Sequence, residues 1–177
     1  MDLRIFKTRK EIRRAFLALR ADRMPDEIRV ADICREADIN KTTFYKHYED
    51  LQALSEDIEK DSLVMVINEF EEKEALLENP RAYGKGLLSA LEKQKKTLSV
   101  VFRGRAEVMG AKLEEMLSAF YSAEQPVKKI KISFIIGGLI GVFKDHLFGK
   151  TDGTLKEAVA EYSAQVLEWM DKISLKD

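Results

Sequence analysis

The sequence predicts an all-α protein, and three observations lead to that prediction. Only 3 of the 177 residues are proline, so few positions interrupt a helix. Apolar residues recur at i, i+3, i+4 and i+7 in several long segments, which is the pattern of an amphipathic helix. No segment alternates apolar and polar residues in the way that a half-buried strand requires. We therefore expect helices joined by short turns, and no sheet.

Four helices are expected in the first part of the chain. Pro25 ends the first, a basic amphipathic helix, and Asn79-Pro80 ends the fourth, which is much longer than its neighbours. Between the second and third, Asp38 tolerates the left-handed backbone of a tight turn, and Asn40 can cap the helix that follows. The expected ranges are 4–22, 30–37, 41–47 and 50–78.

Four or five further helices are expected after Asn79-Pro80. The breaks between them fall near Gly104, at 122–126 and at 149–153, where Gly, Ser, Pro or Asp residues gather. The last helix keeps one apolar face over its whole length, which is the clearest such pattern in the chain. The expected ranges are 81–96, 98–104, 105–122, 127–148 and 154–173.

Basic residues are concentrated at the beginning of the chain. Residues 1–24 carry eight Lys or Arg and three Asp or Glu, which gives +5; the whole chain carries −1, so the rest sums to −6. This asymmetry has two interpretations: the basic end meets a polyanion, or it forms a solvated helix face.

Cysteine content and hydropathy indicate the class of protein. The single cysteine, Cys34, excludes an internal disulfide and is expected to be a small buried core residue in a reducing cytoplasm. The most apolar run, 132–143, is too short to span a bilayer and is expected to be a buried helix. No signal-peptide pattern opens the chain, so we expect a soluble cytoplasmic protein that does not bind membranes.

The segment INKTTFYKHYED, residues 39–50, crowds polar and aromatic side chains into about three turns. Two short helices joined by a three-residue turn, behind a basic helix, have the layout of a helix-turn-helix, whose second helix lies in the DNA major groove. Lysines neutralise phosphates, and the hydroxyl, amide and imidazole groups bind phosphates or base edges. Phe44 and Tyr48 are expected to anchor this helix from beneath, onto Ile12, Phe16 and Ile33. The residues expected to contact DNA are Asn40, Lys41, Thr42, Thr43, Tyr45, Lys46 and His47.

The stretch EIRVADICREADINKTTFYKHYEDLQAL, residues 27–54, resembles the TetR-type (tetracycline-repressor-like) transcriptional regulators. Their pattern is of the kind V-x-D-I-A-x-x-A-G-V-S-x-x-T-F-Y-x-H-F. The resemblance covers about 10–54. It implies a helix-turn-helix DNA-binding domain over 1–62, joined by a long helix to a helical effector-binding and dimerisation domain over 63–177.

Three departures from the residues usual in the TetR-type family bear on DNA binding. Asp38 stands where the turn usually has Gly, which changes the charge of the turn. Arg29 replaces the usual Thr or Ser before the second helix and is expected to reach a phosphate instead. Glu49-Asp50 lies where a basic residue is common, so we expect DNA affinity to depend on dimerisation.

The resemblance also implies a homodimer bound to a palindromic operator, with a small-molecule effector that changes the spacing of the two recognition helices. Glycines within 127–148 allow close approach of another helix, and a four-helix interface with 154–173 is one solution. The alternative is that both helices fill the core of one chain. The residues expected at a dimer interface are Gly138, Gly141, Phe143, Tyr162 and Trp169.

An effector pocket is the least specific expectation. Aromatic and Met side chains on the middle helices could line a cavity or could equally be ordinary core. His146, near the end of its helix, is expected to be a surface residue rather than a ligand. The candidates are Tyr83, Phe102, Met109, Met116, Phe120 and Phe134.

The leading functional hypothesis is a homodimeric, sequence-specific DNA-binding transcriptional regulator, a repressor released from its operator by a small molecule. The alternative is a co-regulator whose C-terminal domain binds another protein. An enzyme is not expected, because His47 and His146 are far apart in sequence and no nucleophile–base or metal-spaced cluster accompanies them. We expect no cofactor and no metal.

Overall fold

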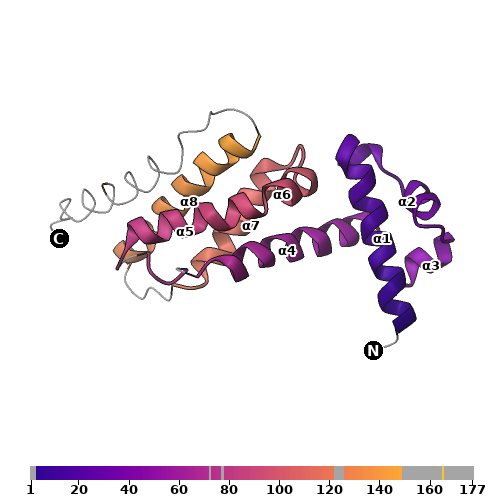
Figure 1. Cartoon of the computed structure of the whole chain (residues 1–177), viewed down its shortest axis with the longest axis horizontal. Helices are drawn as coiled ribbons and strands as arrows, with labels where there is room; N and C mark the ends of the chain where they lie inside the picture. Colours follow the sequence, from indigo (N-terminus) through magenta and orange to yellow (C-terminus); the bar gives the residue numbers. More distant parts are fainter. Residues whose placement is uncertain (1–2, 72, 77, 122–125, 149–164, 166–177) are drawn as a thin grey trace. The chain divides into compact units, whose positions relative to one another are not determined.

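The structure is a computed structural model that describes residues 3–71, 73–76, 78–121, 126–148 and 165. The described residues form helices and turns without a strand, so the all-α prediction is confirmed for this part of the chain (Figure 1). They divide into two compact units. The first contains residues up to 62 together with 96–105, and the second contains 63–95 and the described residues from 106 onward.

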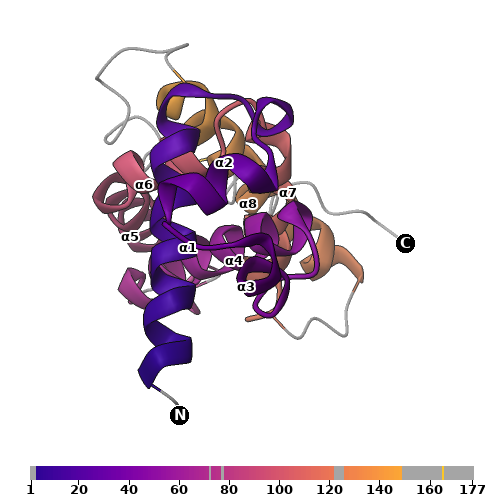
Figure 2. The ribbon, with the colours of Figure 1, turned by 90° about the vertical axis from the view of Figure 1, so that its right-hand side faces the viewer.

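The first unit is built on α1 (Leu3–Asp22), α2 (Val30–Glu36) and α3 (Lys41–Tyr45). Ile12, Ala15 and Phe16 are buried on one face of α1, as the apolar spacing predicts. A 3₁₀ turn over Pro25–Glu27 connects α1 to α2. Both views show α2 and α3 on the same side of α1, and the first turns of α1 extend beyond α3 (Figures 1 and 2).

A tight turn connects α2 to α3. Asp38 has a φ of 52°, which is the left-handed conformation expected at this position. The Ile39 N–H donates to the Cys34 carbonyl at 2.9 Å, which satisfies an otherwise unpaired carbonyl at the end of α2. Asn40 then caps α3, because its Oδ1 accepts a hydrogen bond of 2.8 Å from the Thr43 N–H. Backbone chemistry therefore determines where α3 begins.

The helix α4 (Leu51–Glu69) begins in the first unit and continues into the second. Asp50 caps it by accepting a 2.8 Å hydrogen bond from the Ala53 N–H, which gives the acidic pair at 49–50 a structural role. The predicted extension of this helix to residue 78 is wrong, since α4 ends at Glu69. Beyond it the Tyr121 hydroxyl donates to the Lys73 carbonyl at 2.6 Å and accepts from the Leu76 N–H at 3.1 Å. Tertiary hydrogen bonds thus override the helix propensity of this segment.

Residues 96–105 are tied to the rest of the first unit by buried polar groups. The Arg20 side chain, 1% exposed, donates to the backbone carbonyls of Val101 and Arg103. Arg105 forms an ion pair with the buried Glu59. Gly104 has a φ of +72°, and a Cβ at this position would clash with the Met24 side chain. The break near Gly104 is therefore confirmed, and its backbone conformation favours glycine.

The second unit is formed by the end of α4 with α5 (Pro80–Lys93), α7 (Ala106–Ser118) and α8 (Pro126–Leu147), whereas α6 (Lys95–Val101) lies almost wholly in the first. Helices α7 and α8 pack side by side, and α5 also contacts α8 (Figure 1). Phe70, Tyr83 and Tyr121 form edge-to-face aromatic contacts in its core. Helix α7 is shorter than the predicted 105–122. The predicted helix over 154–173 lies outside the described residues.

Candidate nucleic-acid interface

The outward side of α3 and the residues that flank it form one polar surface, which we call the α3 surface and define as Asn40–Thr43, Tyr45 and Lys46. Lys41, Thr42, Tyr45 and Lys46 are exposed, and Tyr45 keeps 55% of its surface accessible. Thr43 is half-buried, and so is His47, just beyond the α3 surface. The structure therefore brings the predicted DNA-contacting residues of this segment together on one short helix and its ends.

The opposite side of α3 is anchored in the core. Phe44 is 0% exposed and Tyr48 is 5% exposed, which confirms the prediction that both are buried. Their ring centroids lie 6.1 Å apart, and the Tyr45 ring meets Phe44 edge-on at 5.5 Å. Burial of Phe44 thus fixes which side chains of α3 point outward.

The chemistry of the α3 surface is that of a hydrogen-bonding and cationic patch. Two lysines supply positive charge, and the Thr42 and Tyr45 hydroxyls can donate to phosphate oxygens. The Asn40 Oδ1 caps α3. The side-chain amide N–H groups of Asn40 can therefore donate to a ligand. Arg29 is exposed at the start of α2, where its backbone N–H donates to Asp32.

Much of the positive charge of α1 is neutralised within the protein. Arg9 and Arg13 pair with Asp57, Arg14 pairs with Glu11, and Arg23 lies 3.7 Å from Asp32. Arg20 is buried, and its pKa is lowered first by that burial and then by the charges of Arg105 and Arg103. The count of +5 over 1–24 therefore overstates the charge that this helix can offer to a polyanion. Lys7 and Lys10 are exposed.

Acidic side chains border the α3 surface. Asp38, Glu49 and Asp50 are exposed next to it. Their negative charges oppose the field of Lys41 and Lys46 and so reduce the attraction of this surface for a polyanion.

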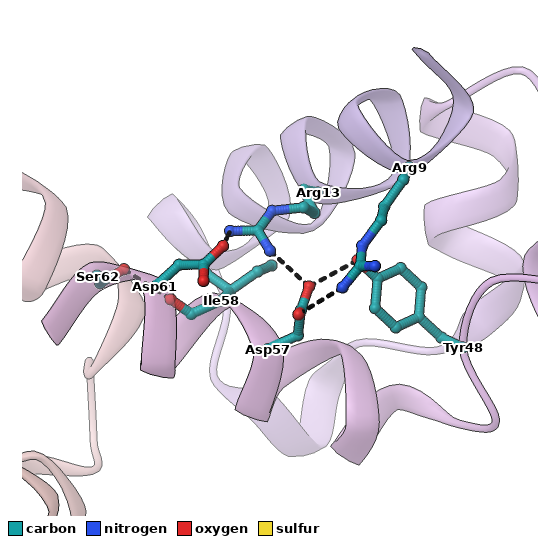
Figure 3. Close-up of polar contacts among 7 residues, drawn as sticks. All are labelled: Arg9, Arg13, Tyr48, Asp57, Ile58, Asp61 and Ser62. Atoms are coloured by element: carbon teal, nitrogen blue, oxygen red, sulfur yellow. Dashed lines mark hydrogen bonds and ion pairs between the residues drawn. The ribbon is translucent and has the colours of Figure 1, made fainter. Parts of the chain in front are cut away.

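A cluster of charged and phenolic groups joins α1, α4 and the residue Tyr48, which follows α3 (Figure 3). The Tyr48 hydroxyl donates to Asp57 Oδ2 at 2.8 Å and accepts from Arg9 Nε at 3.0 Å. Arg9 Nη2 and Arg13 Nη1 each lie 2.5 Å from an Asp57 oxygen, and Arg13 also pairs with Asp61 at 2.7 Å. We call Arg9, Arg13, Tyr48, Asp57 and Asp61 the Asp57 cluster.

The Asp57 cluster shifts the titration of its members. Burial alone raises the pKa of Asp57, but the hydrogen bonds from Arg9 and Tyr48 and the charge of Arg13 outweigh it, so the pKa lies below the ordinary value. The pKa of Tyr48 is raised, chiefly by burial and then by its hydrogen bond to Asp57. This cluster was not predicted from the sequence. The i, i+4 spacing of Arg9 and Arg13 is a signal for one shared face, but nothing in the sequence pairs that face with Asp57.

The six effector-pocket candidates are divided between the two units. Phe102 is buried in the first unit, whereas the others belong to the second. Tyr83 and Met109 are fully buried, and Phe134 is 57% exposed. Burial raises the pKa of Tyr83, and its hydroxyl has no hydrogen-bond partner within the described part of the chain. His146 is more enclosed than expected, with its Nε2 2.8 Å from Glu92.

The dimer-interface candidates lie in different environments. Phe143 is fully buried within the chain itself, so it is a core residue and is not available to a partner. Gly138 is exposed and Gly141 half-buried, with open space where a Cβ would stand on either. Ile130 and Phe134 are exposed on α8 as well. Tyr162 and Trp169 lie outside the described residues.

No family model matches the chain, and no curated protein matches it significantly.

Among the residues that the structure describes, no group of His, Cys, Asp and Glu side chains is placed to hold a metal ion. None of the helices within the described ranges is both long and apolar enough to cross a membrane. Cys34 is buried as expected, and that burial raises the pKa of its thiol.

Proposed function

We propose that this protein is a sequence-specific DNA-binding transcriptional regulator that uses α2 and α3 as a helix-turn-helix. The observation that carries the proposal is the division of α3 into two sides: Phe44 is fully buried, and the lysines, Thr42 and Tyr45 face outward. A short helix of this kind, held by one aromatic anchor, leaves its first residues exposed to contact base edges and phosphates in a major groove.

The outward residues divide by chemistry. Lys41 and Lys46 would neutralise phosphates, which contributes affinity without sequence preference. Thr42 and Thr43 lie in the first turn of α3, where they would approach base edges. Tyr45, His47 and Arg29 would donate to phosphates on either side and fix the register of the protein on the duplex.

The proposal includes a homodimer on a palindromic operator. The acidic side chains beside the α3 surface weaken the attraction of a single copy for DNA, and two linked copies that bind two half-sites overcome this by avidity. Ile130, Phe134 and Gly138, exposed on α8, supply an apolar face on which a second copy can pack.

Release by a small molecule would involve the second unit. The buried Tyr83 hydroxyl, unpartnered within the described residues, is a group that a polar atom of an effector could satisfy. We propose that the protein is a repressor and that binding of such an effector releases it from its operator.

Selection from a randomised pool of duplex DNA tests the proposal. The full chain is incubated with the pool, bound duplexes are recovered and amplified, and the enriched sequences are titrated beside scrambled versions. We expect an inverted repeat with half-sites about 10 base pairs apart or a multiple of that distance. Recovery of no sequence with an affinity above that of scrambled duplex would contradict the proposal.

A further inference from the structure

The Asp57 cluster connects the chain just beyond α3 to two longer helices. Tyr48 lies three residues after the end of α3, Arg9 and Arg13 lie on α1, and Asp57 and Asp61 lie on α4. One carboxylate, Asp57, therefore accepts hydrogen bonds from three side chains on two other segments (Figure 3). All five residues belong to the first unit.

The Tyr48 hydroxyl completes this arrangement. The Tyr48 ring is buried beside Phe44, and the Arg9 guanidinium lies 5.3 Å from its centroid. A phenylalanine, as in the TetR-type pattern, has the ring but not the hydroxyl that links Arg9 to Asp57. The ring fills the core whether residue 48 is tyrosine or phenylalanine. The hydroxyl therefore adds no buried apolar surface; it fixes the orientation of the side chain through its hydrogen bonds.

Only Lys46 and His47 separate the end of α3 from Tyr48. The His47 and Tyr48 N–H groups both donate to the Phe44 carbonyl, at 2.9 and 3.0 Å. A displacement of Tyr48 would therefore be transmitted directly to the end of α3, where Tyr45 and Lys46 are exposed. Asp57 itself is half-buried and is paired with Arg9 and Arg13.

We propose that Tyr48 and Asp57 are positioning residues for DNA binding: with Arg9 they hold α3 in the orientation in which its outward side chains meet the duplex. This inference rests on the proposed function. Loss of the hydroxyl lowers the fraction of molecules whose α3 has this orientation, and the apparent dissociation constant rises in inverse proportion to that fraction.

Tyr48→Phe is the decisive variant, and Tyr121→Phe is its matched control. Tyr121 lies in the second unit, and its hydroxyl also makes two hydrogen bonds, to Lys73 and Leu76. Each variant thus removes one hydroxyl with two hydrogen bonds, which join charged side chains at Tyr48 and backbone groups at Tyr121. Only Tyr48 lies close to α3 in sequence. Asp57→Asn, which keeps the shape of the side chain, is a second test of the same cluster.

Affinity for the selected duplex is measured for the full-length proteins over a range of salt concentrations, well below their unfolding temperatures. We expect Tyr48→Phe and Asp57→Asn each to weaken binding about tenfold. Their double variant should be little weaker than either, because both act through one cluster. The slope of log affinity against log salt stays at the wild-type value, since every phosphate-binding side chain is retained. Tyr121→Phe binds as the wild type does.

Hydrogen exchange provides a readout that a purely stabilising role would leave unchanged. The His47 and Tyr48 amides should exchange faster in Tyr48→Phe, while amides in the middle of α1 keep their protection. Equal affinity of Tyr48→Phe and wild type would overturn the inference, and so would a reduced salt slope, which would make the hydroxyl a direct phosphate ligand. Absence of duplex binding by the wild type would instead overturn the proposed function, and with it this inference.

Discussion

The two sides of the five-residue helix α3 differ in burial: one side is packed in the core, and the other is exposed to solvent. Beneath, Phe44 is completely enclosed and Tyr48 is held by hydrogen bonds from Arg9 and to Asp57. Above, Tyr45 and the lysines face solvent. Neighbouring residues, such as Phe44 and Tyr45, therefore have opposite environments.

This difference indicates that the buried side chains of α3 stabilise the fold and that its exposed side chains are available to contact a ligand. A helix this short is not stable alone, so its position depends on its cap, on Phe44 and on the Asp57 cluster. The exposed side chains contribute little to holding it in place and are available for recognition. Substitutions on the two sides should accordingly affect different measurements.

Phe44→Ala should have the largest effect on stability. Removal of a fully buried aromatic ring leaves a cavity beneath α3, and we expect the free energy of unfolding to fall by about 3–5 kcal/mol. Denaturant unfolding followed by circular dichroism measures this. A decrease below about 1 kcal/mol would mean that the underside of α3 is not a packed core.

Arg20→Met should come next. The substitution keeps an unbranched side chain of similar length but removes the donors to the carbonyls of Arg23, Val101 and Arg103. We expect the free energy of unfolding to fall by about 2–3 kcal/mol, because buried acceptors are left unsatisfied. Arg14→Ala is the control, since its ion pair with Glu11 is largely exposed and its removal should leave the free energy of unfolding almost unchanged. If denaturant unfolding showed that Arg20→Met and Arg14→Ala lower the free energy of unfolding equally, the buried hydrogen bonds of Arg20 would not be a source of stability.

The Asp57 cluster should make a pH-dependent contribution to the free energy of unfolding. The folded state holds the pKa of Asp57 below its ordinary value of 3.8, so its stabilisation is complete above that value and is lost as the pH falls through the lower folded pKa. At pH 7 Asp57→Asn should therefore be less stable than the wild type by about 1–2 kcal/mol. The difference, measured by denaturant unfolding at several pH values, should shrink as the pH is lowered below the ordinary value. A difference that stays constant on acidification would contradict this account.

Tyr45→Ala should have the smallest effect on stability. Its ring is more than half exposed and meets Phe44 only edge-on, so we expect the free energy of unfolding to fall by less than about 1 kcal/mol. Its affinity for the selected duplex should nevertheless fall, because the ring and hydroxyl stand on the outward side. A variant that unfolds readily yet binds DNA normally would reverse the assignment of this residue.

The local features of the first unit were predictable from sequence because each has a local cause. The left-handed turn at Asp38, the cap at Asn40 and the burial of Phe44 follow from backbone tolerance, side-chain length and helical spacing. The end of α4 was not predictable in the same way. Residues 70–79 have the composition of a helix, and the hydroxyl that binds their backbone belongs to Tyr121, far away in sequence.

The same limit explains the Asp57 cluster and Phe143. A sequence shows two arginines on one helical face but not the carboxylate that the fold brings to them. Helix α8 is apolar on nearly all sides, so its spacing could not distinguish the side that fills the core, where Phe143 lies, from the side on which Phe134 is exposed. In each case the missing information is the proximity of segments that are distant in sequence.

The most direct test of the central claim is the salt dependence of duplex binding by the wild type and by Lys41→Ala and Lys46→Ala. If α3 lies in the major groove with these lysines on phosphates, the slope of log affinity against log salt falls by about 0.9 for each phosphate that is no longer neutralised. A dimer carries each substitution twice, so the expected decrease in slope is about 1.8 per variant. Stability should be unchanged, since both side chains are exposed. An unchanged slope in both variants, with the wild type bound to its selected duplex, would show that DNA is contacted elsewhere on the protein.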